Sequence, residues 1–524
     1  MAWIDVLSAA DLKAKGKLLV RQEGRQILLV HNGTEVYACA NRCPHEGYPL
    51  SEGTLSNGCV LTCNWHNWKF DLASGATLIG GDRLPLYPAR IEGERVWLDL
   101  SPPDPALRRD AILADLEQAL EDMDQQRLVR ETARLGRLGA DPVDAVRRAI
   151  AWVANRLEFG TTHAIAGAAE WLRLHDGDAT APDEKLACLG EILGHIADDG
   201  QGAKRFPFPP GEAAWSEAAF LEAIEAEDEA RAIALMRGAL SAGLTATELL
   251  PTLLAAALAH YNDFGHSAIY SVKTAELARR LGCEAESALL LLLTRSLAYA
   301  TREDLLPEFS AYRRTLACWG EAFEPCPPLA PASLSGISPK TAKGVVASWG
   351  ARHPPERIFA ALVERAAWQL LHADETLLTR VDGKIADNVG WLDFTHALTF
   401  ADAGLTASRL APDLWPAVLL QLACFVGRND AYTDPSLDAA PYAVADVNGF
   451  LAASTRALFD HGRERFIVSV HLLKTLLAGR ALIEALPESA PLLAAGLNRL
   501  LHARMKGRHV LRTARQMLAL VEQE

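Results

Sequence analysis

The stretch Cys43-Pro-His45, followed 17 residues later by Cys63-Asn-Trp-His66, decides how the first part of this chain folds. Each short clip can present one thiolate and one imidazole from a tight loop. Two thiolates and two imidazoles can hold a single Zn²⁺ in a tetrahedral site. The same four ligands can hold a [2Fe–2S] cluster, with the cysteines on one iron and the histidines on the other. The spacing alone leaves both interpretations open.

Short runs of branched and apolar residues flank the two clips and predict β-strands. Asn32-Gly33 offers a hairpin turn, because both residues tolerate the left-handed backbone conformation. Glu92-Gly93 separates a second pair of runs. The first 100 residues are therefore predicted to form antiparallel β-structure, with strands at residues 17–21, 26–30, 36–39, 86–91 and 95–98.

The proline-rich stretch Ser101-Pro-Pro-Asp-Pro105 ends this pattern and predicts a stiff linker. From Leu107 onward the chain is rich in Ala and Leu, with apolar residues at helical spacing. We expect a multidomain protein in which a small β domain precedes a large all-α region. The predicted divisions are a β domain at 1–100, a linker at 101–110, a first helical half at 111–322, a Pro-rich connection at 323–343 and a second helical half at 344–524.

The composition excludes several classes of partner. The 524 residues are 50% hydrophobic and 23% charged, with a net charge of −14, which disfavours nucleic acids and anionic membranes as partners. The N-terminus lacks the charged and apolar regions of a signal peptide. The apolar runs are too short to span a bilayer, and the one at residues 249–259 is interrupted by Pro251 and Thr252. The sequence thus predicts a cytoplasmic protein without a membrane segment.

Four histidines stand near the starts of predicted helices in apolar or aromatic settings: His163, His266, His396 and His471. After each of the first three, a second apolar segment ends in an acidic cap, which indicates a repeated helix hairpin. Imidazole is a good ligand for iron, and helices of a bundle can each project one inward. The alternative is a purely structural role, in which these histidines lie in the core and bond to backbone carbonyls.

Acidic residues near these histidines extend the candidate set. Asp263 and Asp393 lie three residues before His266 and His396, where they could act as ligands or orient the rings. Glu170, Glu191, His195 and His260 are further candidates. The sequence contains no clear nucleophile motif such as G-x-S-x-G, so it indicates no particular catalytic side chain.

The segments 43–53 and 63–75 closely resemble the Rieske family, which favours a [2Fe–2S] cluster over zinc. The resemblance covers about residues 1–100 and implies a small antiparallel sandwich. It also implies that Cys43 and Cys63 bind one iron, that His45 and His66 bind the other, and that Trp65, Trp68 and Pro85 shield the cluster. Asn67 stands where the family often has Gly. The loops lack the extra cysteines of the bc-type proteins, so the resemblance is to the ferredoxin and oxygenase branch.

The helical remainder does not match the usual catalytic domain of Rieske oxygenases, because no D-x-x-H-x(3–5)-H motif is present. The stretch Phe394-Thr-His396-Ala-Leu-Thr-Phe-Ala401 is similar to the questin-oxidase-like helical family, whose members use oxygen. The whole arrangement also resembles the Rieske-type hydroxylamine oxygenase of bacterial direct ammonia oxidation. These resemblances imply a monooxygenase-like oxidation of a small substrate, with hydroxylamine as a candidate.

Two functions follow as hypotheses. In the first, electrons pass from the cluster to a histidine-bound non-haem iron, where O₂ is used. In the second, the protein is a Rieske ferredoxin with a helical docking domain and no catalytic metal. Because no G-x-G-x-x-G or P-loop motif occurs, a separate NAD(P)H-dependent reductase or ferredoxin is expected as the electron donor. Assembly into a homo-oligomer is compatible with the sequence.

Overall fold

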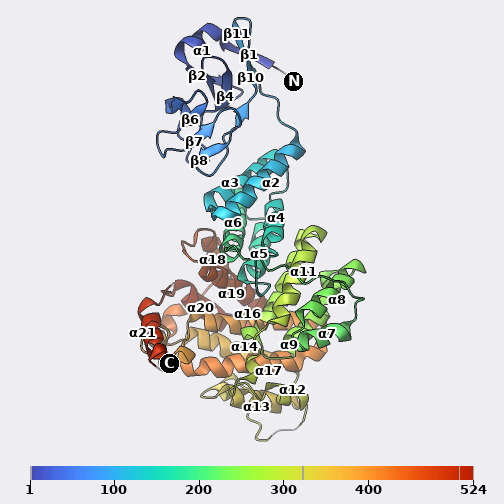
Figure 1. The fold of residues 1–524 in the computed structure, drawn as a ribbon. Helices are drawn as coiled ribbons and strands as arrows, with labels where there is room; N and C mark the ends of the chain where they lie inside the picture. Colours follow the sequence, from blue (N-terminus) through green and yellow to red (C-terminus); the bar gives the residue numbers. More distant parts are fainter. Residues whose placement is uncertain (1–2, 322–323, 507, 523) are drawn as a thin grey trace. The chain divides into compact units, whose positions relative to one another are not determined.

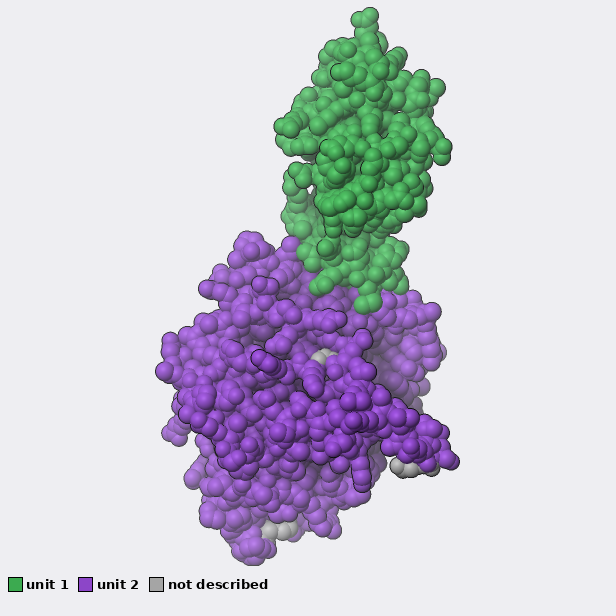
Figure 2. All heavy atoms as spheres, turned by 90° about the vertical axis from the view of Figure 1, so that its left-hand side faces the viewer, with its two compact units in different colours: residues 1–142 green, residues 143–524 purple. Residues whose placement is uncertain are grey.

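The computed structural model describes residues 3–321, 324–506, 508–522 and 524. The chain divides into two compact units, Met1–Pro142 and Val143–Glu524, which Figure 2 colours separately. The expected order of β-structure followed by helices is confirmed. In Figure 1 the labelled strands all belong to the blue N-terminal segment, and the rest of the chain is drawn as helices.

The β part of unit 1 consists of three small sheets in which all strand pairs are antiparallel. The predicted hairpins are present, while the short sheet around the second clip had no clear sequence pattern because its strands have three residues each. The first sheet contains, in order, β1 (Trp3–Ser8), β11 (Arg95–Asp99) and β10 (Ala89–Glu92), and the second contains β2 (Lys17–Gln22), β3 (Arg25–His31), β4 (Val36–Ala40) and β9 (Leu86–Tyr87). The third sheet contains β5 (Thr54–Ser56), β6 (Val60–Thr62), β7 (Lys69–Asp71) and β8 (Thr77–Ile79). Helix α1 spans Ala9–Lys15.

A helix hairpin completes unit 1. Helix α2 (Pro105–Asp122) begins inside the predicted linker, where Asp104 accepts hydrogen bonds from the first backbone amides and the prolines suit a helix start. Helix α3 (Gln125–Leu138) carries arginines that pair with the buried Asp82 of the β part. These contacts place the division after residue 142, whereas the sequence placed it at 101–110.

Unit 2 is organised around four helix hairpins, and the first helix of each carries one of the four histidines. These first helices form a closed four-membered bundle, because α5 contacts α10, α10 contacts α16, α16 contacts α19 and α19 contacts α5. The hairpins are α5 (His163–His175) with α6 (Pro182–Asp199), α10 (His266–Leu281) with α11 (Cys283–Ala298), α16 (Trp391–Leu410) with α17 (Trp415–Asn429), and α19 (Phe466–Ala485) with α20 (Ala490–His502).

The two helical halves expected from the sequence therefore belong to one unit, because the bundle takes two helices from each. The expected Pro-rich connection at 323–343 begins at residue 323, which lies outside the described residues, as does residue 322, and it ends inside α13 (Pro339–Gly350). The remaining helices are α4 (Asp144–Val153), α7 (Glu217–Glu225), α8 (Glu229–Ser241), α9 (Ala246–Leu258), α12 (Tyr312–Ala317), α13 (Pro339–Gly350), α14 (Pro355–Leu371), α15 (Glu375–Thr379), α18 (Val447–Ala457) and α21 (Val510–Val521).

Helix α19 is long and apolar enough to cross a membrane by length and composition, although 72% of its most apolar window is buried inside the structure. The sequence predicts apolar runs too short to span a bilayer, whereas this helix is long enough with 20 residues, although His471 and Lys474 interrupt its apolar run. Both polar residues are buried in the bundle. Buried polar groups are costly without partners, so both side chains need partners inside the bundle.

Candidate metal centres

The two clips of unit 1 have the same backbone turn. The amide of Cys43 donates to the carbonyl of Tyr48 at 2.8 Å, and the amide of Cys63 donates to that of Trp68 at 2.8 Å. Each cysteine carbonyl in turn accepts from the residue four positions later, which is Gly47 in the first clip. Two equivalent loops thus present one cysteine and one histidine each.

Asn67 occupies the position in the second clip that Gly47 occupies in the first. Both residues have positive φ angles, +77° at Gly47 and +61° at Asn67. Asparagine is one of the few residues with a side chain that adopts this left-handed conformation readily. The departure from glycine at Asn67 therefore leaves the turn intact.

The four predicted cluster ligands lie together. Cys43 and Cys63 are buried, and the Nδ1 atoms of His45 and His66 lie 3.1 Å apart. Burial, together with the neighbouring Cys63, raises the pKa of Cys43 to about 11, so a thiolate there needs a cationic partner. Two thiols and two imidazole δ-nitrogens facing one another fit the expected [2Fe–2S] cluster.

The predicted shielding residues have different roles. The ring of Trp68 stacks on His45 with 4.7 Å between centroids, and Gly80 leaves room for it, since a Cβ there would lie 2.3 Å from the indole. Trp65 stacks on His66 but remains 54% exposed. Pro85 acts through its carbonyl, which accepts from the amide of Ala40. His45 is thus covered, whereas His66 faces solvent.

The four helical histidines meet inside the bundle of unit 2. His163 and His266 are the first residues of α5 and α10, and His396 and His471 are the sixth residues of α16 and α19. The Nε2 atom of His266 lies 3.0 Å from that of His163 and 2.9 Å from that of His396. His471 lies against His163 and His396, with ring centroids 4.7 and 5.1 Å apart.

Backbone carbonyls fix the orientation of three of these rings. The Nδ1 atoms of His266, His396 and His471 donate to the carbonyls of Asp263, Leu392 and Ile467 at 2.5 to 2.6 Å. An imidazole that donates through Nδ1 carries a lone pair on Nε2 in its neutral form. The 2.9 Å contact between His266 and His396 therefore brings two lone pairs together, which a hydrogen bond cannot explain.

A cation at the centre would satisfy these nitrogens. The buried Nε2 of His471 has no hydrogen-bond partner among the described residues. The candidate ligand atoms of His163, His396 and His471 all lie within 4.8 Å of one another. With metal–nitrogen bonds of about 2.1 Å, two ligands at right angles stand about 3 Å apart, which agrees with the observed contacts. The donor set therefore fits a metal ion.

The electrostatic setting keeps the imidazoles neutral. Burial, and next the nearby Lys474, lowers the pKa of His266 to about 3. Burial lowers the pKa values of His163, His396 and His471 well below the usual range. Metal binding requires the unprotonated imidazole, so these shifts preserve the binding form at neutral and mildly acidic pH.

The two candidate aspartates differ in their surroundings. Asp263 supports the ring of His266 through its carbonyl, and burial raises the pKa of its carboxyl to about 6. Asp393 instead accepts from the amide of Gly390 at 2.6 Å and pairs with Arg428 at 2.9 Å. Its carboxylate serves the start of its own helix rather than the histidines, because an acid at the third helical position caps the free amides.

The further candidates are held by other partners. Glu170 pairs with Lys273, Glu191 with Ser469 and His461, His195 with Asp199 and the ring of Phe466, and His260 with Asp304 and Glu225. The described structure thus brings together the four histidines and leaves these groups outside the set.

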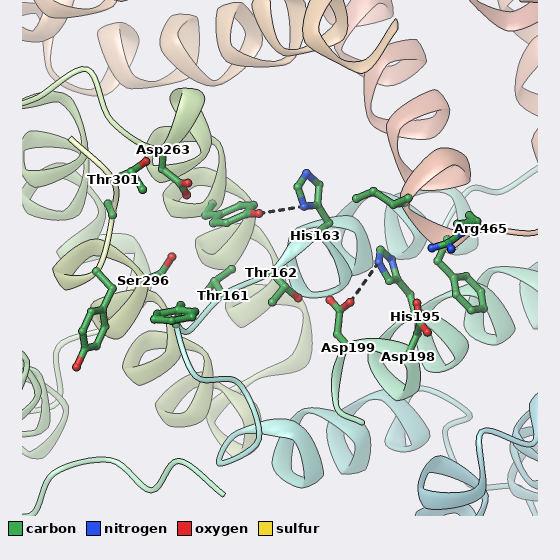
Figure 3. A pocket seen from close by; sticks show the side chains of 16 residues that line it. Thr161, Thr162, His163, His195, Asp198, Asp199, Asp263, Ser296, Thr301 and Arg465 are labelled. Carbon is green, nitrogen blue, oxygen red and sulfur yellow. Dashed lines mark hydrogen bonds and ion pairs between the residues drawn. The ribbon is translucent and has the colours of Figure 1, made fainter. Parts of the chain in front are cut away.

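A cavity of about 670 Å³ opens onto His163. In Figure 3, His163 lies between Asp263 on one side and His195 and Arg465 on the other. The lining also includes Asp198, Asp199 and the hydroxyls of Thr161, Thr162, Ser296 and Thr301. Phe159, Phe466 and Ile467 add apolar surface, so the lining of the cavity is mixed.

Two residues next to the histidines were not predicted as site residues from the sequence. The hydroxyl of Tyr270 lies 3.2 Å from Nδ1 of His163, and its position four residues after His266 was the available signal. Lys474 follows His471 by three residues, and burial lowers its pKa to about 7, against the opposing effect of Glu170. Both add polar groups to the bundle interior.

Comparisons with known proteins concern about a fifth of the chain. Residues 2–82 match the model of the Rieske [2Fe-2S] domain. The ferredoxin component of the naphthalene 1,2-dioxygenase system of Pseudomonas aeruginosa is 34% identical over 101 residues, which are 19% of this chain and 96% of that protein. The 4beta-methylsterol monooxygenase of Methylococcus capsulatus is 33% identical over 128 residues, which are 22% of this chain and 34% of that protein.

The matches to solved structures cover a similar part of this chain. The ferredoxin of carbazole 1,9a-dioxygenase from Nocardioides aromaticivorans IC177 aligns with 19% of this chain and 100% of its own, at 22% identity and a TM-score of 0.18. The chain spans 33% of the NdmA chain of Pseudomonas putida CBB5 in its structure with caffeine, at 24% identity, with 19% of this chain covered and a TM-score of 0.18.

Proposed function

Because this chain belongs, through its N-terminal unit, to the Rieske [2Fe–2S] family, we propose that it is an oxygenase-type oxidoreductase whose helical unit holds the second metal. The reaction is an O₂-dependent oxidation of a small substrate. When bound, the cluster supplies single electrons and a histidine-held non-haem iron supplies the centre that activates O₂.

One observation carries the proposal. Four imidazoles from four separate helices meet in one bundle, and the unprotonated nitrogens of His266 and His396 face each other at 2.9 Å. Core histidines bonded only to carbonyls would have no reason to converge through their remaining nitrogens. This convergence favours a metal site over the alternative of four structural core histidines that bond only to backbone carbonyls.

The residues of the bundle would bind, orient and insulate the ion. The carbonyls that accept from Nδ1 hold His266, His396 and His471 in the binding tautomer. Tyr270 offers its oxygen to Nδ1 of His163 and would orient that ring in the same way. The burial of His396 and His471 keeps bulk water from that side of the site.

The cavity beside His163 is the proposed substrate site. Its lining combines the carboxylates of Asp198, Asp199 and Asp263 with apolar side chains, so a small substrate that carries a polar group would fit. Hydroxylamine, the candidate from sequence resemblance, agrees with this chemistry. Asp263 stands at the wall with a pKa raised to about 6 and could exchange a proton with a bound molecule near neutral pH.

An electron-donor partner belongs to the proposal. The relatives include components named as ferredoxins of dioxygenase and monooxygenase systems. We propose that an NAD(P)H-dependent reductase or a ferredoxin reduces the cluster. The exposed edge formed by Trp65 and His66 is available for that contact.

A second candidate is an electron carrier with a helical docking unit and no catalytic metal. The observation in its favour is that the chain covers 96% of a ferredoxin component. In this case the four histidines would have only a structural role.

Iron analysis of the full chain tests the proposal. We expect more than two irons per chain, with the excess lost in the double variant His266→Ala/His396→Ala while the visible spectrum of the cluster survives. Two irons per chain, with unchanged iron content in the double variant, would reject the oxygenase proposal and leave the electron-carrier function as the remaining candidate.

A further inference from the structure

An arginine from outside the family match reaches the first cluster clip. Arg130 of α3 donates from a terminal nitrogen to the carbonyl of His45 at 3.5 Å. Its Nε lies 2.8 Å from a carboxylate oxygen of Asp82, whose side chain is fully buried. The family match ends at residue 82, so α3 is an addition to the matched domain.

The same helix hairpin packs beneath the ring that covers His45. A Cβ at Gly81 would lie 3.7 Å from the indole of Trp68, 3.8 Å from Asp124 and 3.9 Å from Arg127. The indole in turn stacks on His45. Helix α3 therefore contacts the clip through Arg130, while Asp124 and Arg127 lie beside the Gly81 turn that also faces Trp68.

Arg130 shares its buried carboxylate partner, Asp82, with a second arginine. Arg134 also contacts Asp82, at 3.3 Å, and pairs with Glu131. Burial raises the pKa of Glu131 to about 7, so this acid is only partly ionised at neutral pH. Arg127, which pairs with Asp115 and Asp122, and the carboxylate of Asp124 also lie near the turn. Glu46 adds an exposed carboxylate within 4.8 Å of the ring nitrogens of His45 and His66.

We propose that Arg130 is a positioning residue that holds the His45 clip and raises the reduction potential of the Rieske cluster. A positive charge beside a ligand histidine stabilises the added electron, because cluster potentials respond to nearby charge and to hydrogen bonds at the ligands. Among the described contacts, no arginine touches the His66 clip. His45 is held and covered, while His66 is left open to an electron-transfer partner.

The test uses the full chain with its cluster assembled. Arg130→Met keeps the length of the side chain but removes its charge, Arg130→Lys retains the charge, and Arg137→Met removes an exposed arginine from the same helix. Each midpoint is measured by spectroelectrochemical titration, and visible circular dichroism checks that the cluster is intact. At a fixed applied potential we expect Arg130→Met to lower the ratio of reduced to oxidised cluster at least three-fold, where ten-fold corresponds to about 59 mV for one electron.

We expect Arg130→Lys to keep most of the parent ratio and Arg137→Met to match the parent. An Arg130→Met protein with an intact cluster spectrum and the parent midpoint would overturn the proposal, as would an equal shift in Arg137→Met. If Arg130→Met fails to assemble the cluster, Arg130→Gln is compared with Arg130→Lys, and equal midpoints of these two variants would reject the role of charge. The proposal rests on the Rieske cluster alone, so its failure is separate from that of the helical metal site.

Discussion

The Nε2 atoms of His266 and His396 lie 2.9 Å apart although 130 residues separate them in the sequence. Both rings donate through Nδ1 to a carbonyl, so two lone pairs face each other. An ion bound between the two nitrogens would accept both lone pairs.

Ferrous iron is therefore expected to raise the melting temperature of the helical unit. Binding to the folded state alone contributes about 2.7 kcal/mol when the free ion is at 100 times its Kd. The measurement is calorimetry of anaerobic protein with and without added iron. His396→Ala should lose the increase, whereas His372→Ala, a buried histidine bonded to the carbonyl of Trp368, should keep it. An equal increase in both variants would contradict the site.

Tyr270→Phe is expected to weaken metal binding. The hydroxyl near Nδ1 of His163 orients that ring, and losing such a partner typically costs 10- to 100-fold in affinity. Competition against a chelator measures the change. Tyr299→Phe serves as control, because this residue lines the same cavity but bonds to Glu229. Unchanged affinity in Tyr270→Phe would remove the tyrosine from the site.

Gly167→Ala is expected to disturb two histidine-bearing helices at once. A Cβ at this position of α5 would lie 2.2 Å from a methyl of Val470 on α19. Overpacking of this kind costs about 1–3 kcal/mol and would separate His163 from His471. Denaturant unfolding and iron retention provide the two measurements. Gly344→Ala, in α13 with open space around its Cβ, should raise stability by about 0.5–1 kcal/mol and leave iron retention unchanged.

Lys474→Met is expected to change how stability depends on pH. The folded protein holds the pKa of Lys474 near 7, below its ordinary value of 10.5, because burial disfavours the ammonium group. Between these values the unfolded chain binds more protons, so the parent gains stability as pH rises, by up to about 1.4 kcal/mol per pH unit. Below pH 7 Lys474 is protonated in the folded protein as well, so the full cost of burying its ammonium group lowers the free energy of unfolding.

The Met variant should therefore exceed the parent in stability most at pH 7, and the difference should shrink towards pH 10. Urea unfolding at pH 7, 8.5 and 10 measures it. Lys340→Met, at an exposed position, should follow the parent. A constant difference across the three pH values would show that Lys474 keeps its charge in the folded state.

Cys63→Ser should abolish the visible absorption of the cluster without unfolding unit 2, because the two units have separate cores. Cys59→Ser, which changes a half-buried cysteine outside the clips, should retain it. The measurements are absorption and far-ultraviolet circular dichroism. Retention of the cluster spectrum in Cys63→Ser would rule out this residue as a ligand.

The cluster domain was predictable because its signals are local. Cys43, His45, Cys63 and His66 stand in two short clips, and the family comparison confirmed the Rieske domain. The helical histidines were predictable as a set because each repeats a position near a helix start. Their convergence was less accessible, since it depends on helix packing between residues more than 100 positions apart.

Other features were hidden by ambiguous local signals. Asp393 was a candidate ligand by its spacing from His396, yet the same position is that of a helix-capping acid. The prolines at 102–105 indicated a linker, but Asp104 and Pro105 begin α2. The docking of α3 depends on Asp82 and Arg130, whose pairing has no periodic signature in the sequence.

The closed bundle has a consequence for biosynthesis. Its imidazoles come from hairpins that begin at His163 and end with the helix of His471, so the last of them emerges from the ribosome long after the first. A nascent chain can complete the ring only once α19 has been made. Metal capture would then report that translation has passed this helix, and truncated products would stay iron-poor and open to proteolysis.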